Sequence, residues 1–265
     1  TMTTPAHTFA CDTHTHTIFS RHAYSTIGEC VAAAQAVGLE LIGSTDHYSC
    51  MISPTLHVRD YQHFINFDVW PRAWGGVRVM RGVEADVVDL DGHLFGWDMP
   101  LAEDITGRAL EREQTLKEYV WRGLDYAIAS IHDQTFAERG TLAQTTDMYV
   151  RALDDPKVFI LGHIGRTGLD VDVKEILLRA RELGKCIEIN EHSLVGGYGR
   201  SPERCRSIAE QCAELGVQIV TSSDAHISYD VGKFDAVASL LEEIRFPEEL
   251  IVTRSREAFL SALGA

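Results

Sequence analysis

The stretch Asp12-Thr-His-Thr-His-Thr-Ile-Phe-Ser-Arg-His22 follows a short apolar run and carries three histidines close together. If Thr8–Thr13 is a buried strand, His14 and His16 leave it with their side chains on one face, because side chains alternate along a strand. Two imidazoles on one face can hold a divalent ion, and His22 in the following loop can reach a second one. The stretch therefore predicts a metal site, with two solvated loop histidines as the alternative.

The composition narrows the class of protein. The chain has 265 residues, 45% of them hydrophobic, which suits one α/β domain over residues 1–265. The net charge of −15 argues against nucleic acid as a partner, because such binding rests on Lys and Arg neutralising phosphates. No run approaches the ~18 apolar residues of a membrane span. Six cysteines without a CxxC pair indicate reduced thiols and a cytoplasmic protein. A homo-oligomer stays open.

Short runs rich in Val and Ile alternate with helical patterns about seven times along the chain. This alternation is typical of βα units around a parallel sheet, and each run is short enough for a barrel strand. We therefore predict an α/β fold with seven strands. They are Thr8–Thr13, Leu39–Thr45, Val77–Val83, Tyr126–Ile131, Val158–Gly162, Cys186–Asn190 and Gln218–Ser222.

Apolar residues at spacings of three and four predict the helices between and after these strands. The segment Tyr48–Gly76, which contains two prolines and several aromatic residues, fits no regular element and is predicted to cap the barrel mouth. Asp89–Trp97 is predicted to form a hairpin. The predicted helices are Ile27–Val37, Asp172–Leu183, Pro202–Leu215, Phe234–Ile244 and Ser255–Leu263.

Metal-binding residue types follow six of the seven predicted strands, and only Cys186–Asn190 contributes none. In parallel barrels the C-terminal strand ends meet at the active site, so residues far apart in the sequence converge there. Seven imidazoles and two carboxylates in one place require bound cations. These nine predicted ligands are His14, His16, His22, His47, Glu84, His132, His163, Asp224 and His226.

The combination of H-x-H, T-D-H, G-x-E, a lone histidine after each of two strands and S-D-A-H resembles the PHP (polymerase and histidinol phosphatase) family, over about Cys11 to Pro247. The strings His22-Ala-Tyr-Ser-Thr26 and His63-Phe-Ile-Asn66 resemble its small stand-alone bacterial phosphatases. The resemblance implies a distorted (βα)7 barrel with a trinuclear metal site at the C-terminal ends of the strands.

The resemblance also divides the nine ligands into three sets, with Glu84 as a bridge. Imidazole and carboxylate donors favour zinc, and manganese or iron are alternatives because occupancy also follows availability. The first ion would be held by His14, His16, Glu84 and Asp224, the second by His22, His47 and His226, and the third by Glu84, His132 and His163.

Neighbouring ions clamp phosphate oxygens and lower the pKa of a bridging water. The predicted reaction is therefore hydrolysis of a small phosphomonoester, a phosphorylated metabolite, by attack of a metal-bridging hydroxide, with Glu84 holding the ions that activate it. Protonation of the leaving group is assigned to Asp224, Asp133 or His192, or to metal-bound water.

Two arginines are predicted to bind the substrate phosphate, because a guanidinium can contact two phosphate oxygens at once. Arg166 lies three residues after His163, and Arg200 ends the glycine-rich loop Gly196–Arg200. Where the family branch more often has S-H-P-G-N, this chain has Gly162-His-Ile-Gly-Arg166. The substrate contacts are therefore not carried over from the family.

Three other functions compete with the phosphatase. A 3′–5′ exonuclease is disfavoured by the acidic charge, and an amidohydrolase-type metal hydrolase by the lack of a lysine at any predicted strand end. A catalytically silent metal-binding scaffold is disfavoured by the complete set of ligands.

Overall fold

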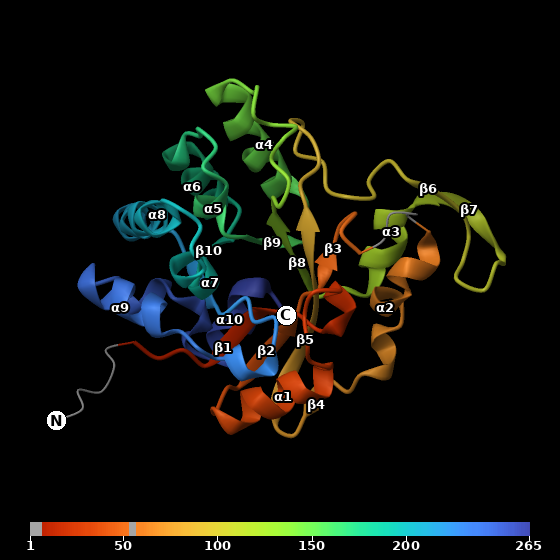
Figure 1. Ribbon diagram of the computed structural model, residues 1–265, viewed down its shortest axis with the longest axis horizontal. Helices are drawn as coiled ribbons and strands as arrows, with labels where there is room; N and C mark the ends of the chain where they lie inside the picture. The colour runs from red at the N-terminus through yellow and green to blue at the C-terminus, as the bar shows by residue number, and fades with distance from the viewer. Residues whose placement is uncertain (1–6, 53–56) are drawn as a thin grey trace.

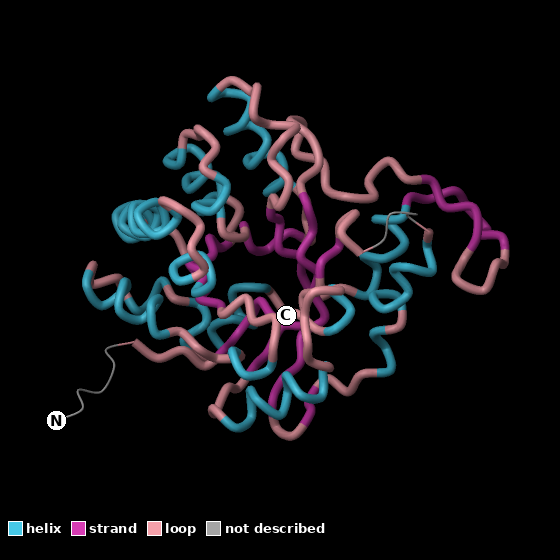
Figure 2. Tube along the Cα trace, in the orientation of Figure 1, coloured by secondary structure: helices cyan, strands magenta, loops and turns pink. Residues whose placement is uncertain are grey.

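Seven parallel strands form the centre of the protein, in the spatial order β1-β2-β5-β8-β9-β10-β11. The structure is a computed structural model that describes residues 7–52 and 57–265. The strands curve into a ring with helices outside it (Figures 1 and 2), so the predicted α/β barrel is confirmed. The bounds are β1 Cys11–Thr15, β2 Leu41–Ser44, β5 Val77–Asp86, β8 Tyr126–Ser130, β9 Val158–Leu161, β10 Cys186–Asn190 and β11 Ile219–Ser222.

The ring closes between the first and last strands through a few contacts only. Thr15 and Ala225 form an isolated parallel bridge. The backbone N–H of Asp224 donates to the His14 carbonyl at 3.0 Å, and that of His16 donates to the Ala225 carbonyl at 2.9 Å. These contacts lie at the C-terminal ends of β1 and β11. The backbone hydrogen bonds that close the barrel are therefore made by the predicted ligands His14, His16 and Asp224 themselves.

Strand β5 extends three residues beyond its predicted end, so Glu84 lies inside the strand. The reason is a second partner: after β2 ends, the chain forms the short strand β3 (His47–Tyr48), and His47 pairs with Glu84. On the other side, Glu84 pairs with Ile128 of β8. The long strand therefore holds Glu84 between two neighbours at the centre of the barrel mouth.

Amphipathic helices cover the outside of the barrel, and α1, α4, α6 and α10 begin with a side-chain cap. In α1 the Thr26 hydroxyl accepts a hydrogen bond from the Glu29 N–H while the Glu29 carboxylate accepts one from the Thr26 N–H, which satisfies two otherwise unpaired donors. Helix α4, between β8 and β9, is additional to the helices predicted. The larger helices are α1 Ile27–Ala36, α4 Leu142–Asp154, α6 Val173–Glu182, α8 Ser201–Leu215, α9 Asp235–Glu243 and α10 Arg256–Leu263.

Shorter elements complete the connections. The prediction of a hairpin at Asp89–Trp97 is wrong in its extent: that segment is a turn with a single antiparallel bridge between Val87 and Leu94. The Asp89 carboxylate accepts hydrogen bonds from the backbone N–H groups of Asp91 and His93, which stabilises a turn here in place of a longer hairpin. The two-stranded hairpin lies further on and projects from the barrel (Figure 1). These elements are β4 Ala73–Trp74, β6 Pro100–Glu103, β7 Ala109–Thr115, α2 Gln62–Ile65, α3 Leu116–Val120, α5 Ile164–Thr167 and α7 Glu191–Val195.

The segment predicted to cap the barrel mouth contains residues 53–56, which lie outside the described residues. From His57 onward it folds into short helices whose tyrosine and phenylalanine side chains are fully buried. Tyr61, Phe64 and Phe67 join Tyr48 in one core cluster. This packing makes residues 57–70 part of the core, with one partly open edge that is described below.

The opposite end of the barrel is filled from the tail of the chain. Thr253 lies between β1 and β11: its carbonyl accepts from the Ala10 N–H at 2.9 Å, and its hydroxyl lies 2.7 Å from that of Thr221. Phe259 of α10 is fully buried and packs edge-on against Tyr126 and Phe159. The inner cluster thus takes residues from each of the seven strands and from the tail.

All six cysteines are unpaired, as predicted, and only Cys50 among them is exposed. Among the described residues, no helix has the length and hydrophobicity needed to cross a bilayer.

Candidate metal centre

The first predicted ligand set lies buried at the ends of three strands. His14 Nε2 is 3.0 Å from His16 Nε2 and 3.3 Å from Glu84 Oε2. Asp224, just past β11, places Oδ1 3.2 Å from His16 Nε2. Its backbone has φ +55°, an uncommon conformation for a residue other than glycine, which the hydrogen bond to the His14 carbonyl holds in place. The four side chains therefore point at one another, as the prediction requires.

The second predicted set lies nearer the surface. His22 follows the 3-10 turn Ile18–Ser20, and its Nε2 lies 3.3 Å from His47 Nε2 and 3.0 Å from His226 Nε2. The ring of His22 is stacked on both of the other rings. Three imidazoles thus meet at one edge of the barrel mouth.

Glu84 joins the two remaining histidines to the rest of the cluster. Its Oε1 lies 2.7 Å from His163 Nε2 and 3.3 Å from His132 Nε2. Its Oε2 faces the other side, 2.8 Å from His47 Nδ1 and 3.4 Å from His16 Nε2. One carboxylate therefore presents its two oxygens to two separate groups of imidazoles.

Three groups in the described part of the chain bring one donor atom per residue within 4.8 Å of one another. They overlap with the predicted sets but divide the residues differently, since His16 joins the second group in place of His22 and His47 joins the third in place of His163. The groups are His14, His16 and Asp224; His16, His47 and His226; and His47, Glu84 and His132.

The donor atoms fit divalent ions. His14 and His132 donate from Nδ1 to carboxylates at 2.7 and 2.6 Å, and His226 donates from Nδ1 to a backbone carbonyl at 2.9 Å. A bond at Nδ1 leaves the Nε2 lone pair free for a metal, and the Nε2 atoms of these rings point into the cluster. Glu84 Oε2 is buried without a hydrogen bond. An ion here would satisfy atoms that the described residues leave without partners.

The electrostatics agree with a cation at this position. Burial opposes ionisation of Glu84, but the imidazoles of His132, His14 and His47 hold its pKa well below the usual range. Burial also lowers the pKa of His14, yet the carboxylates of Glu188, Glu84 and Asp224 raise it well above its ordinary value. The cluster therefore keeps its carboxylates charged and attracts positive charge, which protons or metal ions can supply.

A cavity of about 270 Å³ opens over the cluster. Arg166 lines it and donates from Nη2 to Asp224 Oδ2 at 2.9 Å and to Asn190 Oδ1 at 3.0 Å. The guanidinium also lies 4.7 Å from the ring centre of Tyr198, and the Tyr198 hydroxyl is 3.0 Å from His192 Nε2. Histidines of the cluster, an arginine and an aromatic ring thus surround one small space.

Comparison with known proteins decides the family. A model of the PHP domain matches residues 12–192, which includes six of the strands around the cluster. The chain belongs to the PHP domain family.

Individual relatives match almost the whole chain. A probable phosphatase from Acetivibrio thermocellus is 40% identical over 95% of this chain and 93% of its own length. A probable phosphatase from Caldanaerobacter subterraneus is 39% identical over 92% and 87%. A histidinol phosphate phosphatase from Lactococcus lactis, solved with zinc, L-histidinol and phosphate, has a TM-score of 0.55 at 18% identity, covering 90% of this chain and 94% of that one. The last likeness shows a shared fold, and the predicted resemblance to the family is confirmed.

In this PHP domain, sequence reasoning missed Glu188, the main partner of the ligands. Its carboxylate is buried in β10, the strand predicted to contribute nothing, and accepts from His14 Nδ1 at 2.7 Å and from the His163 N–H at 2.8 Å. It also accepts from the Ser222 hydroxyl at 2.5 Å. A glutamate in the middle of the apolar run Cys-Ile-Glu-Ile-Asn is the signal that could have found it.

Two further aspartates orient predicted metal ligands, one directly and one through a serine hydroxyl. Asp86 accepts from His132 Nδ1. Asp46 accepts from the Ser20 hydroxyl at 2.7 Å, and that hydroxyl lies 3.0 Å from His16 Nδ1. Asp12 instead accepts from the backbone N–H and hydroxyl of Ser223. It therefore caps the turn that carries Asp224.

The predicted substrate-side residues of the PHP site separate into two groups. Arg166 and His192 line the cavity, as does Asp224. Asp133 is exposed, and hydrogen bonds from Thr135 lower the pKa of its carboxyl. Arg200 is exposed at the start of α8. Among the described residues that line the cavity, Asp133 and Arg200 do not occur.

Proposed function

We propose that this protein is a metal-dependent phosphatase that hydrolyses a small phosphomonoester. The observation that carries the proposal is Glu84, whose two oxygens face separate imidazole groups beneath a cavity that also contains a guanidinium. The names of the relatives support the same reaction, since they are probable phosphatases, and the Lactococcus lactis protein holds zinc and phosphate.

The proposed cofactors are three divalent ions, with zinc favoured by the imidazole and carboxylate donors. Glu84 would bridge two of the three ligand sets predicted from the family, and its buried, unpaired Oε2 supports that role. Bound ions of this kind activate water as a nucleophile and neutralise charge on the phosphate. Asp224 lies between the proposed metal site and the cavity: its Oδ1 faces His16, and its Oδ2 faces Arg166.

Arg166 is the proposed phosphate-binding residue. Its guanidinium is fixed by Asp224, Asn190 and Ser193, so little side-chain entropy is lost when it binds an oxyanion. Of the three residues considered for protonating the leaving group, Asp133 lies outside the cavity lining, and Asp224 is engaged as a carboxylate by Arg166. His192 is the one that we propose, because it lines the cavity and an imidazole can transfer a proton near neutral pH.

A substrate comparison tests the function. We expect the metal-replete protein to hydrolyse at least one small phosphomonoester roughly 100-fold faster than single-stranded DNA, because the cavity is small and the chain has a net charge of −15. The measurement is phosphate release across a panel of phosphorylated metabolites, beside nuclease activity on a labelled oligonucleotide. Equal turnover on DNA would favour the exonuclease, and no turnover on either would favour the silent scaffold.

Glu188 provides a second test, because it contacts two proposed ligands without touching the cavity. Glu188→Gln is expected to weaken metal affinity by about 10–100-fold, the usual cost of losing a residue that orients metal ligands. Affinity is measured by competition with a chelator. Glu191→Gln is the matched control: this carboxylate is also buried, but accepts from the Ala236 and Val237 N–H groups. If both variants bind metal equally well, Glu188 has no orienting role.

A further inference from the structure

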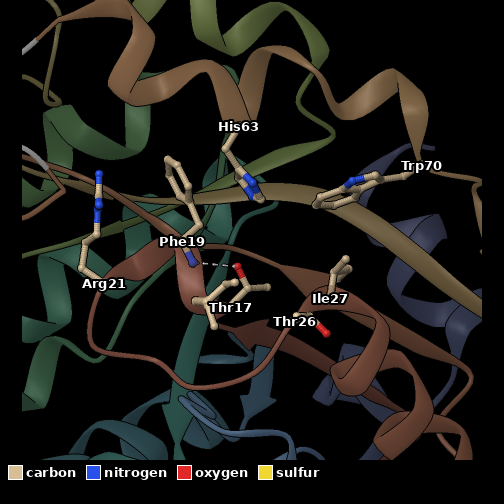
Figure 3. Close-up of a pocket in the computed structure, with 8 residues that line it drawn as sticks. Thr17, Phe19, Arg21, Thr26, Ile27, His63 and Trp70 are labelled. Atoms are coloured by element: carbon tan, nitrogen blue, oxygen red, sulfur yellow. Dashed lines mark hydrogen bonds between the residues drawn. The ribbon is translucent and has the colours of Figure 1, made fainter.

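A second and larger cavity, of about 470 Å³, lies beside the segment that links His16 to His22. It shares no lining residue with the cavity over the metal centre. Figure 3 shows Arg21 at one end and Trp70 at the other, with Phe19 and His63 between them. Its volume falls within the range of about 300–1,000 Å³ typical of sites for small organic molecules.

The walls of this cavity are flat and apolar. The rings of Phe19 and His63 are stacked at 4.2 Å with an angle of 11° between their planes, and Trp70 stands at 67° to His63, 5.6 Å away. All three rings are half-buried, so part of each ring is accessible to a ligand. Ile27 lines the cavity, and Ile18 at its edge is 56% exposed. A planar apolar group would bury surface on several of these side chains at once.

The polar groups that line the cavity indicate which charge a ligand would carry. Thr17 is satisfied, because its N–H and hydroxyl donate to the Asp46 carboxylate at 2.7 and 2.8 Å. His63 Nε2 lies 3.2 Å from the same carboxylate. Within residues 7–52 and 57–265 the Arg21 guanidinium has no hydrogen-bond or ion-pair partner. One free cation therefore stands at the end of an aromatic cavity.

We propose that this cavity binds a small molecule with a flat aromatic ring and an anionic substituent, such as an aromatic carboxylate. The ring lies against Trp70, His63 and Ile27, and the anion pairs with Arg21. This inference does not depend on the phosphatase function. A ligand bound here contacts the segment between His16 and His22, so it also restrains the loop that positions two of the proposed metal ligands.

The test uses naphthalene-2-sulfonate, a flat anion that phosphatases do not hydrolyse, and the uncharged naphthalene-2-methanol. Isothermal titration is carried out on the metal-replete protein with saturating inorganic phosphate, which occupies the cavity over the metal centre. We expect the sulfonate to bind with a Kd of about 1 mM or tighter, and the alcohol to bind more weakly.

Ile27→Trp, which fills the cavity, and Trp70→Leu, which removes a wall, should each weaken sulfonate binding by at least about tenfold. Arg21→Gln should weaken the sulfonate but not the alcohol. The matched controls, Trp97→Leu and Arg245→Gln, should change neither: Trp97 is an exposed ring stacked on His93 elsewhere, and Arg245, like Arg21, has positive φ. Circular dichroism checks the folding of each variant. Failure of the sulfonate to bind in the presence of saturating phosphate, or binding that survives both cavity variants, would overturn the proposal.

Discussion

Glu84→Gln is expected to lower kcat/KM for a phosphomonoester by roughly three orders of magnitude or more. The carboxylate lies at the centre of the cluster, within 3.4 Å of nitrogens from five histidines. The amide that replaces it has one oxygen and no charge. It can therefore face only one imidazole group as an acceptor, and it removes negative charge that offsets the bound ions.

Metal content separates this effect from loss of the fold. Elemental analysis of the wild-type protein, purified without chelator, should give close to three divalent ions per chain, and Glu84→Gln should lose at least one. Glu191→Gln serves again as the buried control, with metal content unchanged. A wild-type content of one ion or fewer after metal-supplemented growth contradicts the trinuclear site, and a fully active Glu84→Gln contradicts the bridge.

Arg166→Ala is expected to reduce kcat/KM by roughly 10–1000-fold, which corresponds to the loss of a charge-assisted contact worth about 1.5–4 kcal/mol. The guanidinium lines the cavity and is held by Asp224 and Asn190, so its removal takes away the proposed phosphate partner. Steady-state kinetics on the best substrate of the panel measures the change.

The structure adds a control to this experiment. Arg200→Ala removes the other predicted arginine, which is exposed at the start of α8, and should leave kcat/KM unchanged. Arg166→Ala also deprives Asp224 of its buried ion-pair partner, so its metal content is measured in parallel. Full activity of Arg166→Ala, or an equal loss in Arg200→Ala, shows that Arg166 does not bind the phosphate.

The sequence predicted the barrel well because both of its signals were local. Apolar runs of strand length and apolar residues at spacings of three and four depend on neighbours a few residues away. The errors arose where distant segments decide the outcome. β5 continues past Val83 because β3 pairs with its end, and the hairpin β6–β7 carries mainly exposed residues without a clear apolar alternation.

The same distinction applies to the site. Ligand positions such as His14 and Asp224 were predictable because they follow strands whose ends converge. Glu188 and Asp86 were not, since their importance depends on which imidazole nitrogen lies against them in the folded chain. Arg166 and Arg200 looked equivalent in sequence, and only the packing of α5 and α8 places one in the cavity and the other at the surface.

The contacts of Thr253 and Phe259 have a consequence for synthesis of the chain. Thr253 joins the segment before β1 to β11, and Phe259 fills the inner cluster beneath β8 and β9. A nascent chain translated only as far as His226 holds all nine predicted ligands but lacks Thr253 and Phe259, which seal the opposite end of the barrel. Chains emerge at about 5–20 residues per second, so β1 is synthesised well before β11 and the tail. We therefore expect the complete site to form only after translation of the tail.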